Sequence, residues 1–291
     1  MGDAAPTPPP RRALRWWHGL VLFAAAMAMQ ILIGLTYGIV TWYSLPPGSG
    51  REEHMALLLG APSVGIQVLL TSALLSTLAL LPARLVTGAA GAALRLARPS
   101  RASAAVLAAA GVLPAGMIID QAAYLLHDFR PGLFHTRTLD MFSDVFAGSG
   151  PLAFAVVTLA ITLGPALGEE LFFRGLLLRS FLRDMPAWAA VSGSAALFGV
   201  LHMDPLQGAA AGLMGLYLGY AVLATGSVWP AVAAHGLNNL ACSLAARFDP
   251  EGLGRTYEHG HHPAVLAAAA ILLVLAIVGI ERARRRPVQS S

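Results

Sequence analysis

The chain alternates long apolar segments with short polar connections. A helix of about twenty apolar residues crosses the hydrocarbon core of a bilayer, so each segment of that length predicts a membrane span. Eight segments reach or approach this length, at residues 17–42, 55–82, 104–126, 152–182, 187–203, 206–224, 228–246 and 263–280. We therefore predict an all-α, polytopic membrane protein with about eight transmembrane helices.

The composition supports this prediction. Apolar residues make up 56% of the 291 residues and charged residues only 12%, which is too little charge for a soluble globular protein of this length. All 19 basic residues are Arg, so the high pI of about 9.7 reflects a bias in residue usage. We expect membrane lipid around the chain and no nucleic-acid partner. The single cysteine, Cys242, excludes an intramolecular disulfide and a CxxC metal site.

The arginines are distributed unevenly among the connections. Fourteen of the 19 lie in the N-terminal segment, the connector 84–101, the region 174–183 and the C-terminal segment, whereas the alternate connections hold five. The positive-inside rule then places both termini in the cytoplasm. The resulting division of the chain is a cytoplasmic tail (1–16), three spans with their loops (17–149), a core that carries the candidate chemistry (150–247), and an outer loop, last span and basic cytoplasmic tail (248–291).

Two of the connections have apolar residues of their own. In the connector 84–101, Arg and apolar residues are interleaved, which indicates either an interfacial helix on the inner headgroups or a solvated loop. The outer loop 127–150 contains four phenylalanines and a methionine, so we expect it to pack onto the spans as a partial cap.

Three ionisable side chains interrupt the fourth apolar segment. A charge inside a membrane costs at least ~2.5 kcal/mol before it is paired, so each of them needs a reason to be there. Glu170 and Arg174 are four residues apart with the acid first, which is the favoured arrangement for an ion pair on a helix. Glu169 remains without an assigned partner and is a candidate general base. The alternative is an ion-pair cluster with a purely structural role.

Two further pairs of residues lie in later apolar segments. Phe198 and His202 are four residues apart, as are His235 and Asn239, so each pair occupies one face of a helix. Folding the segments at the turn 184–186 brings His202 level with Glu169. If this hairpin projects into the cytoplasm, His235 lies at the same depth, and all the groups meet in the cytoplasmic half of the membrane. A carboxylate, two imidazoles and a carboxamide together provide a base, a proton shuttle and oxyanion donors for hydrolysing an amide.

The same side chains include the atoms that bind first-row metals. Glu169, His202 and His235 are suitable ligands for a divalent metal such as Zn. The HExxH spacing of zinc proteases is absent, so the sequence permits a metal without requiring one. No other cofactor is expected.

These residues resemble the CPBP family of intramembrane proteases, also called the Abi or CAAX-processing family. The family pattern EExxxR, FxxxH and HxxxN occurs in order, on separate predicted helices, between about residues 150 and 245. In this chain its positions are Glu169, Glu170, Arg174, Phe198, His202, His235 and Asn239. The resemblance implies a CAAX-protease-like bundle of helices.

The resemblance also implies roles for the residues of this pattern. Glu169 would activate water with the assistance of His202, and His235 with Asn239 would donate hydrogen bonds to the oxyanion. The supporting residues would be Glu170, Arg174 and Phe198.

The function implied is that of an intramembrane endopeptidase acting on a membrane-bound or lipidated peptide or protein, in the cytoplasmic membrane of a bacterium. The family includes enzymes described as metalloproteases and others described as glutamate proteases, and its members act on prenylated proteins and peptide precursors or serve in immunity. Two alternatives are a non-catalytic membrane binding or immunity protein and a proton-coupled transporter. Complete motifs argue against the first, and the absence of paired broken helices in the sequence argues against the second.

Overall fold

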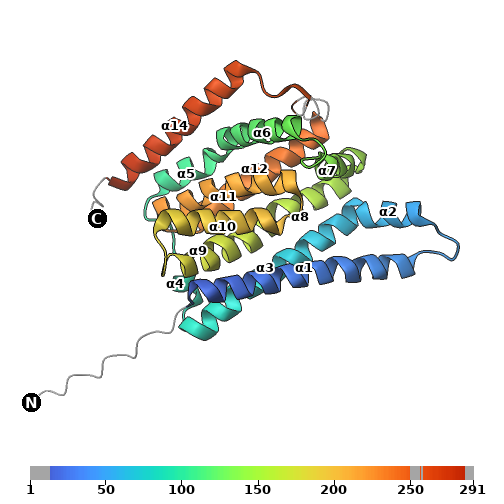
Figure 1. The fold of residues 1–291 in the computed structure, drawn as a ribbon, viewed down its shortest axis with the longest axis horizontal. Coiled ribbons are helices and arrows are strands. Elements are labelled where there is room, and N and C mark those ends of the chain that lie inside the picture. The colour runs from blue at the N-terminus through green and yellow to red at the C-terminus, as the bar shows by residue number, and fades with distance from the viewer. Residues whose placement is uncertain (1–13, 250–255, 257, 286–291) are drawn as a thin grey trace, which may run out of the picture.

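The computed structural model describes residues 14–249, 256 and 258–285, and every regular element in this part of the chain is a helix (Figure 1). The elements are α1 (Trp16–Ser44), α2 (Arg51–Leu59), α3 (Ala61–Thr87), α4 (Ala90–Ala93), α5 (Ala102–Ala110), α6 (Val112–Phe129), α7 (Arg137–Gly148), α8 (Pro151–Glu170), the π-helix η1 (Leu171–Leu177), α9 (Leu178–Phe181), α10 (Ala187–Leu201), α11 (Pro205–Thr225), α12 (Trp229–Phe248) and α14 (Pro263–Arg285). The predicted all-α class is confirmed.

All eight predicted spans are helical. Among the described residues, six helical stretches are long and apolar enough to cross a membrane: α1, α3, α5 with α6, α8 through α9, α11 and α14. The helix α10 has only 15 residues, and α12 has 20 residues but is not among the six because His235, Asn238 and Asn239 interrupt its apolar sequence. The protein is therefore a multi-pass membrane protein, and the predicted count of eight is approximate.

The helix α8 lies at the centre of the bundle, between α3 on one side and α12 on the other (Figure 1). The helices α10 and α11 form a hairpin that packs against η1, the continuation of α8. On the far side of α12, the helices α5, α6 and α14 pack against one another. This arrangement places the acidic end of α8 inside the bundle.

Glycines on α8 allow α3 to approach closely. A Cβ atom on Gly168 would lie 2.8 Å from the Cα atom of Ser72, and one on Gly164 would lie 2.9 Å from the Ser72 hydroxyl. Lipid tails are as apolar as the helix faces, so helices in a membrane gain little by burying apolar surface against one another. They associate largely through close packing at small residues such as these. Gly199 and Gly208 make a similar close contact between α10 and α11.

The connector 84–101 is partly packed onto the protein. Residues 84–87 form the end of α3 and Ala90–Ala93 is helical, and Leu94 is buried against Gly175 of η1. The Ser227 hydroxyl, in the turn between α11 and α12, donates a hydrogen bond to a carbonyl of this connector. Leu94 is therefore packed onto the protein, whereas Leu85 and Ala97 of the same connector remain exposed.

The outer connection packs onto the bundle as predicted. The Thr138 hydroxyl of α7 donates a hydrogen bond of 2.8 Å to Asp204 Oδ2, in the turn between α10 and α11. The other oxygen of Asp204 accepts from the main-chain N–H of Gln207 and caps the start of α11. Phe146 is buried, and Arg247 of α12 donates to its carbonyl. The helix α7 thus covers the turn that follows α10.

We predict that Gly168→Ala lowers the stability of the bundle, because its Cβ atom must displace the main chain of Ser72. Overpacking of this kind costs roughly 1 to 3 kcal/mol. The matched control is Gly34→Ala in α1, where nothing lies within 4 Å of the new atom and loss of a helical glycine is expected to be neutral or stabilising. Thermal melting in detergent compares the two variants, and equal melting temperatures would contradict the proposed contact.

Candidate active site

The acidic pair stands where α8 changes into a π-helix. Glu169 and Glu170 are the last two residues of α8, and η1 begins at Leu171 and includes Arg174. All seven residues of η1 are buried. Single π-helical turns inside α-helices occur often at functional sites, because the extra residue turns the following side chains toward a different face.

The ion pair predicted between Glu170 and Arg174 is confirmed. Arg174 Nη1 donates a hydrogen bond of 2.8 Å to Glu170 Oε1. The Arg174 side chain is 1% exposed and that of Glu170 is 0% exposed. The guanidinium also lies 4.2 Å from the ring centroid of Phe198, a favourable cation–π distance. A Cβ atom on Gly215 of α11 would lie 3.2 Å from Arg174 Nη2, so the glycine leaves room for the guanidinium.

His235 of α12 reaches both acidic residues. Its Nδ1 atom is 2.9 Å from Glu170 Oε1, and its Nε2 atom is 3.8 Å from Glu169 Oε2. A carboxylate oxygen can only accept, so we assign the hydrogen to Nδ1. Glu170 Oε1 thus accepts from both His235 and Arg174, whereas Glu170 Oε2 has no hydrogen-bond partner among the described residues.

Glu169 differs from these neighbours in its exposure. The Glu169 side chain is 14% exposed, whereas those of Glu170, Arg174 and His235 are at most 8% exposed. Within this group of four, the carboxylate of Glu169 is therefore the acidic group best placed to meet water.

Phe198 separates the two histidines. Its ring centroid lies 5.9 Å from that of His235 and 5.1 Å from that of His202, with the rings near perpendicular in both pairs. His202 follows the last residue of α10 and is half-buried, and its Nδ1 atom is 2.9 Å from the Phe198 carbonyl oxygen. Since a carbonyl accepts, Nδ1 carries the hydrogen and Nε2 is left for other partners.

Asn239 contacts the main chain of α8. Its side-chain amide donates a hydrogen bond of 3.1 Å to the Ile161 carbonyl, two turns before Glu169. Gly236 of α12 faces α8 at the same place, since a Cβ atom there would lie in ordinary contact with Ala166 and Thr162. In this arrangement Asn239 fixes the position of α12 on α8, and with it that of His235 against the acidic residues.

Two residues that the motifs did not indicate also support this site. Gln30 of α1 donates a hydrogen bond of 3.2 Å to the Leu201 carbonyl, beside His202, and its own amide oxygen has no hydrogen-bond partner among the described residues. The Ser194 hydroxyl of α10 donates to the Phe173 carbonyl of η1. For Gln30 there was a signal in the sequence, because it is the one amide side chain in an apolar helix of 29 residues.

The three side chains predicted as metal ligands do not form one cluster. Within the part of the chain that the structure describes, no group of three His, Cys, Asp or Glu residues is placed to hold a metal ion. Glu169 and His235 lie together, but His202 contacts Phe198. As placed, these three side chains do not fit a three-ligand metal site.

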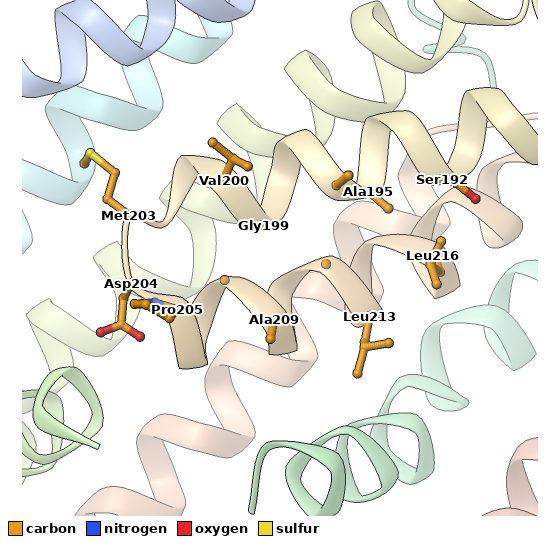
Figure 2. Close-up of a pocket in the computed structure, with 13 residues that line it drawn as sticks. Ser192, Ala195, Gly199, Val200, Met203, Asp204, Pro205, Ala209, Leu213 and Leu216 are labelled. Carbon is orange, nitrogen blue, oxygen red and sulfur yellow. The ribbon is translucent and has the colours of Figure 1, made fainter. Parts of the chain in front are cut away.

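A groove lies between α10 and α11, which run side by side and are joined at Met203, Asp204 and Pro205 (Figure 2). Its volume is about 660 Å³. Its lining is largely apolar and rich in small residues, and it reaches Gly199 and Val200, just before His202. Glu169, Glu170 and His235 do not line it, so the groove adjoins the polar cluster at the His202 end without containing it.

Comparison with known families supports the resemblance seen in the sequence. Residues 151–241 match a family model described as type II CAAX prenyl endopeptidase, Rce1-like. This segment holds all seven residues of the three motifs, so the predicted resemblance to CAAX-processing proteases is confirmed there, and it indicates a membrane peptidase. No curated protein and no solved structure matches the chain significantly.

We predict that Glu170→Gln destabilises the protein, because it leaves the buried Arg174 guanidinium without a counter-charge. Breaking a buried pair from one side costs roughly 3 to 5 kcal/mol. The control is the double variant Glu170→Gln with Arg174→Met, which removes both charges and should regain much of the lost stability. Thermal melting in detergent measures both. If the double variant regains nothing, the ion pair is not what stabilises this part of the bundle.

Proposed function

We propose that the protein is an intramembrane endopeptidase of the CAAX-processing type, in which Glu169 activates the water that cleaves the peptide bond. The observation that carries this proposal is the difference between the two acidic residues. Glu170 is fully buried and accepts from Arg174 and His235, whereas Glu169 retains accessible surface and lies 3.8 Å from His235. A general base must reach the proton it removes, so Glu169 suits that role and Glu170 does not.

In the proposed reaction, Glu169 takes a proton from water while the water oxygen attacks the carbonyl carbon of the scissile peptide. The negative charge that develops on the carbonyl oxygen requires hydrogen-bond donors. The proton held by Glu169 then passes to the amide nitrogen, which leaves as an amine. The carboxylate is regenerated at the end of the cycle.

The histidines supply the remaining groups. In both His202 and His235 the Nδ1 hydrogen is donated to an oxygen of the protein, so the Nε2 atom is the one that faces the reaction. A neutral imidazole then accepts a proton at Nε2, and a protonated one donates to an oxyanion. We assign the oxyanion to protonated His235, which Glu170 orients, and we assign the positioning of water or the leaving nitrogen to His202. In this scheme Asn239 acts through its contact with α8.

The substrate that we propose is a lipidated or otherwise membrane-bound peptide. The matching family is described as acting on prenylated CAAX proteins. In this chain the apolar groove of α10 and α11 ends beside His202, which gives a lipid chain or an apolar peptide a place next to the polar cluster. A bacterial cytoplasmic membrane is the setting we propose.

The orientation that we propose has both ends of the chain in the cytoplasm. The described arginines of the connector 84–101, of α9 and of the end of α14 lie at the same end of the bundle as the start of α1 (Figure 1). The positive-inside rule assigns that end to the cytoplasm.

We predict that Glu169→Gln lowers cleavage of a membrane-bound peptide library at least a hundredfold, since general-base catalysis typically contributes that much. The protein is assayed in liposomes with and without a chelator. The matched control, Glu52→Gln, changes an exposed acid of α2 and should cleave as the wild type does. Activity of Glu169→Gln above a hundredth of the wild type would exclude Glu169 as the base. Loss of wild-type activity with the chelator would assign a metal to the reaction.

We also predict the side on which each connection lies. Fusions of alkaline phosphatase, which is active outside the cytoplasm, should be inactive after Ser100 and after Pro186 and active after Gly48 and after Gly132. Fusions of green fluorescent protein should give the opposite result at each position. An active phosphatase after Pro186 would show that α8 through α9 ends outside, which contradicts the proposed orientation.

A further inference from the structure

A second cavity lies at the arginine-rich end of the bundle, away from the groove of α10 and α11. Its volume is about 210 Å³, several times the ~30 Å³ that a water molecule occupies in the liquid. It lies between the end of α3, the connector that carries Leu94, and the segment formed by η1 and α9. Leu94 and Leu176 form part of its wall and are buried, so the cavity is partly apolar.

Two arginines line this cavity. Arg179 of α9 and Arg183 of the turn after it both line the cavity, and two like charges at one cavity are unfavourable without a counter-ion. The Nε atom of Arg179 is buried and has no hydrogen-bond partner among the described residues. Arg95 adds an unfavourable electrostatic interaction with Arg179. The end of the cavity is therefore positively charged, with a donor left unused.

The described residues provide no acid to balance this charge. None of the side chains that line the cavity is Asp or Glu. The acid next in sequence, Asp184, is engaged elsewhere, since it lies 3.6 Å from Arg15 and accepts a hydrogen bond from the main-chain N–H of Trp16. Arg179 is half-buried and Arg183 is exposed. A guanidinium with a buried N–H group, such as that of Arg179, is normally compensated by a carboxylate or a phosphate that accepts from it.

We propose that this cavity binds the phosphate group of an anionic phospholipid. The phosphate oxygens accept from Arg179 and Arg183, and the glycerol and the start of the acyl chains lie against the apolar wall formed by residues such as Leu94 and Leu176. Arginine suits this role because its planar group binds phosphate through two parallel hydrogen bonds. The cavity opens at the end of the bundle where membrane headgroups lie in the proposed orientation.

A ligand in this cavity would act on the segment that carries the acidic pair. Arg179 belongs to α9, which continues η1 without a break, and Gly175 and Leu176 of η1 form another wall. A bound phosphate would therefore contact the segment that continues η1. The proposal concerns binding alone and does not depend on the peptidase activity.

The test uses the full chain in a neutral detergent and measures binding by native mass spectrometry. The probes are phosphatidylglycerol, zwitterionic phosphatidylcholine and inorganic phosphate. The variant Arg179→Gln with Arg183→Gln removes the cavity's charge, and the control Arg84→Gln with Arg98→Gln removes the same charge from exposed positions near the same end of the bundle. We expect phosphatidylglycerol to bind wild type and control equally, and at least tenfold more weakly to the cavity variant.

Each other outcome has a definite meaning. If inorganic phosphate alone shows this dependence on the cavity, the ligand is a free phosphate and the lipid source is wrong. Equal weakening in the cavity variant and the control would overturn the site, as would failure of phosphatidylglycerol and phosphate to bind the wild type.

A second measurement needs no variant and so remains decisive if the cavity variant does not fold. A photoreactive phosphatidylglycerol is cross-linked to the wild-type protein, and the modified peptides are identified. Cross-links within residues 87–94 or 175–183 would support the proposal. Cross-links that map only to other parts of the chain would overturn it.

Discussion

The polar centre of this protein depends on a single oxygen atom, Oε1 of Glu170. It accepts from Arg174 on the following π-helical turn and from His235 on α12, and the two donors have little other polar support. In a low-dielectric interior such charge-assisted hydrogen bonds are strong, and the loss of one partner leaves the others desolvated. The position of α12 relative to α8 thus depends on the ion pair. Because Nδ1 of His235 is bound to Glu170, Nε2 is the ring nitrogen that lies toward Glu169.

Helices outside the segment that matches the family model also contribute to the site. Gly168, next to the acidic pair, packs directly on Ser72 of α3, and Gln30 of α1 binds the carbonyl at the end of α10 beside His202. These contacts give two of the spans outside that segment, α1 and α3, a structural role at the site. The first three predicted spans carry none of the motifs, but α1 and α3 hold the two sides of the site in place.

The sequence predicted the helices and the motif residues well, because both depend on local spacing. A run of about twenty apolar residues is enough to locate a span. A separation of four residues on a helix is enough to pair Glu170 with Arg174. What spacing could not predict was the partner of each remaining group. His235 binds Glu170 as well as lying near Glu169, Asn239 binds α8, and part of the connector 84–101 packs onto the protein. Each of these outcomes depends on contacts between distant segments, which an apolar pattern does not specify.

The charges of the cluster fit the roles proposed for Glu169 and His235. With His235 protonated, as its proposed role at the oxyanion requires, two carboxylates face one guanidinium and one imidazolium, so the group of four is electrically neutral. Arg174 and His235 both donate to Glu170, which leaves Glu169, the acid with accessible surface, to take a proton from water. When it does so, the group gains one positive charge just as a negative charge develops on the carbonyl oxygen, and opposite charges attract strongly in a medium of low dielectric constant. The buried ion pair thus orients His235 toward the oxyanion and leaves the proposed base at the position where water can reach it.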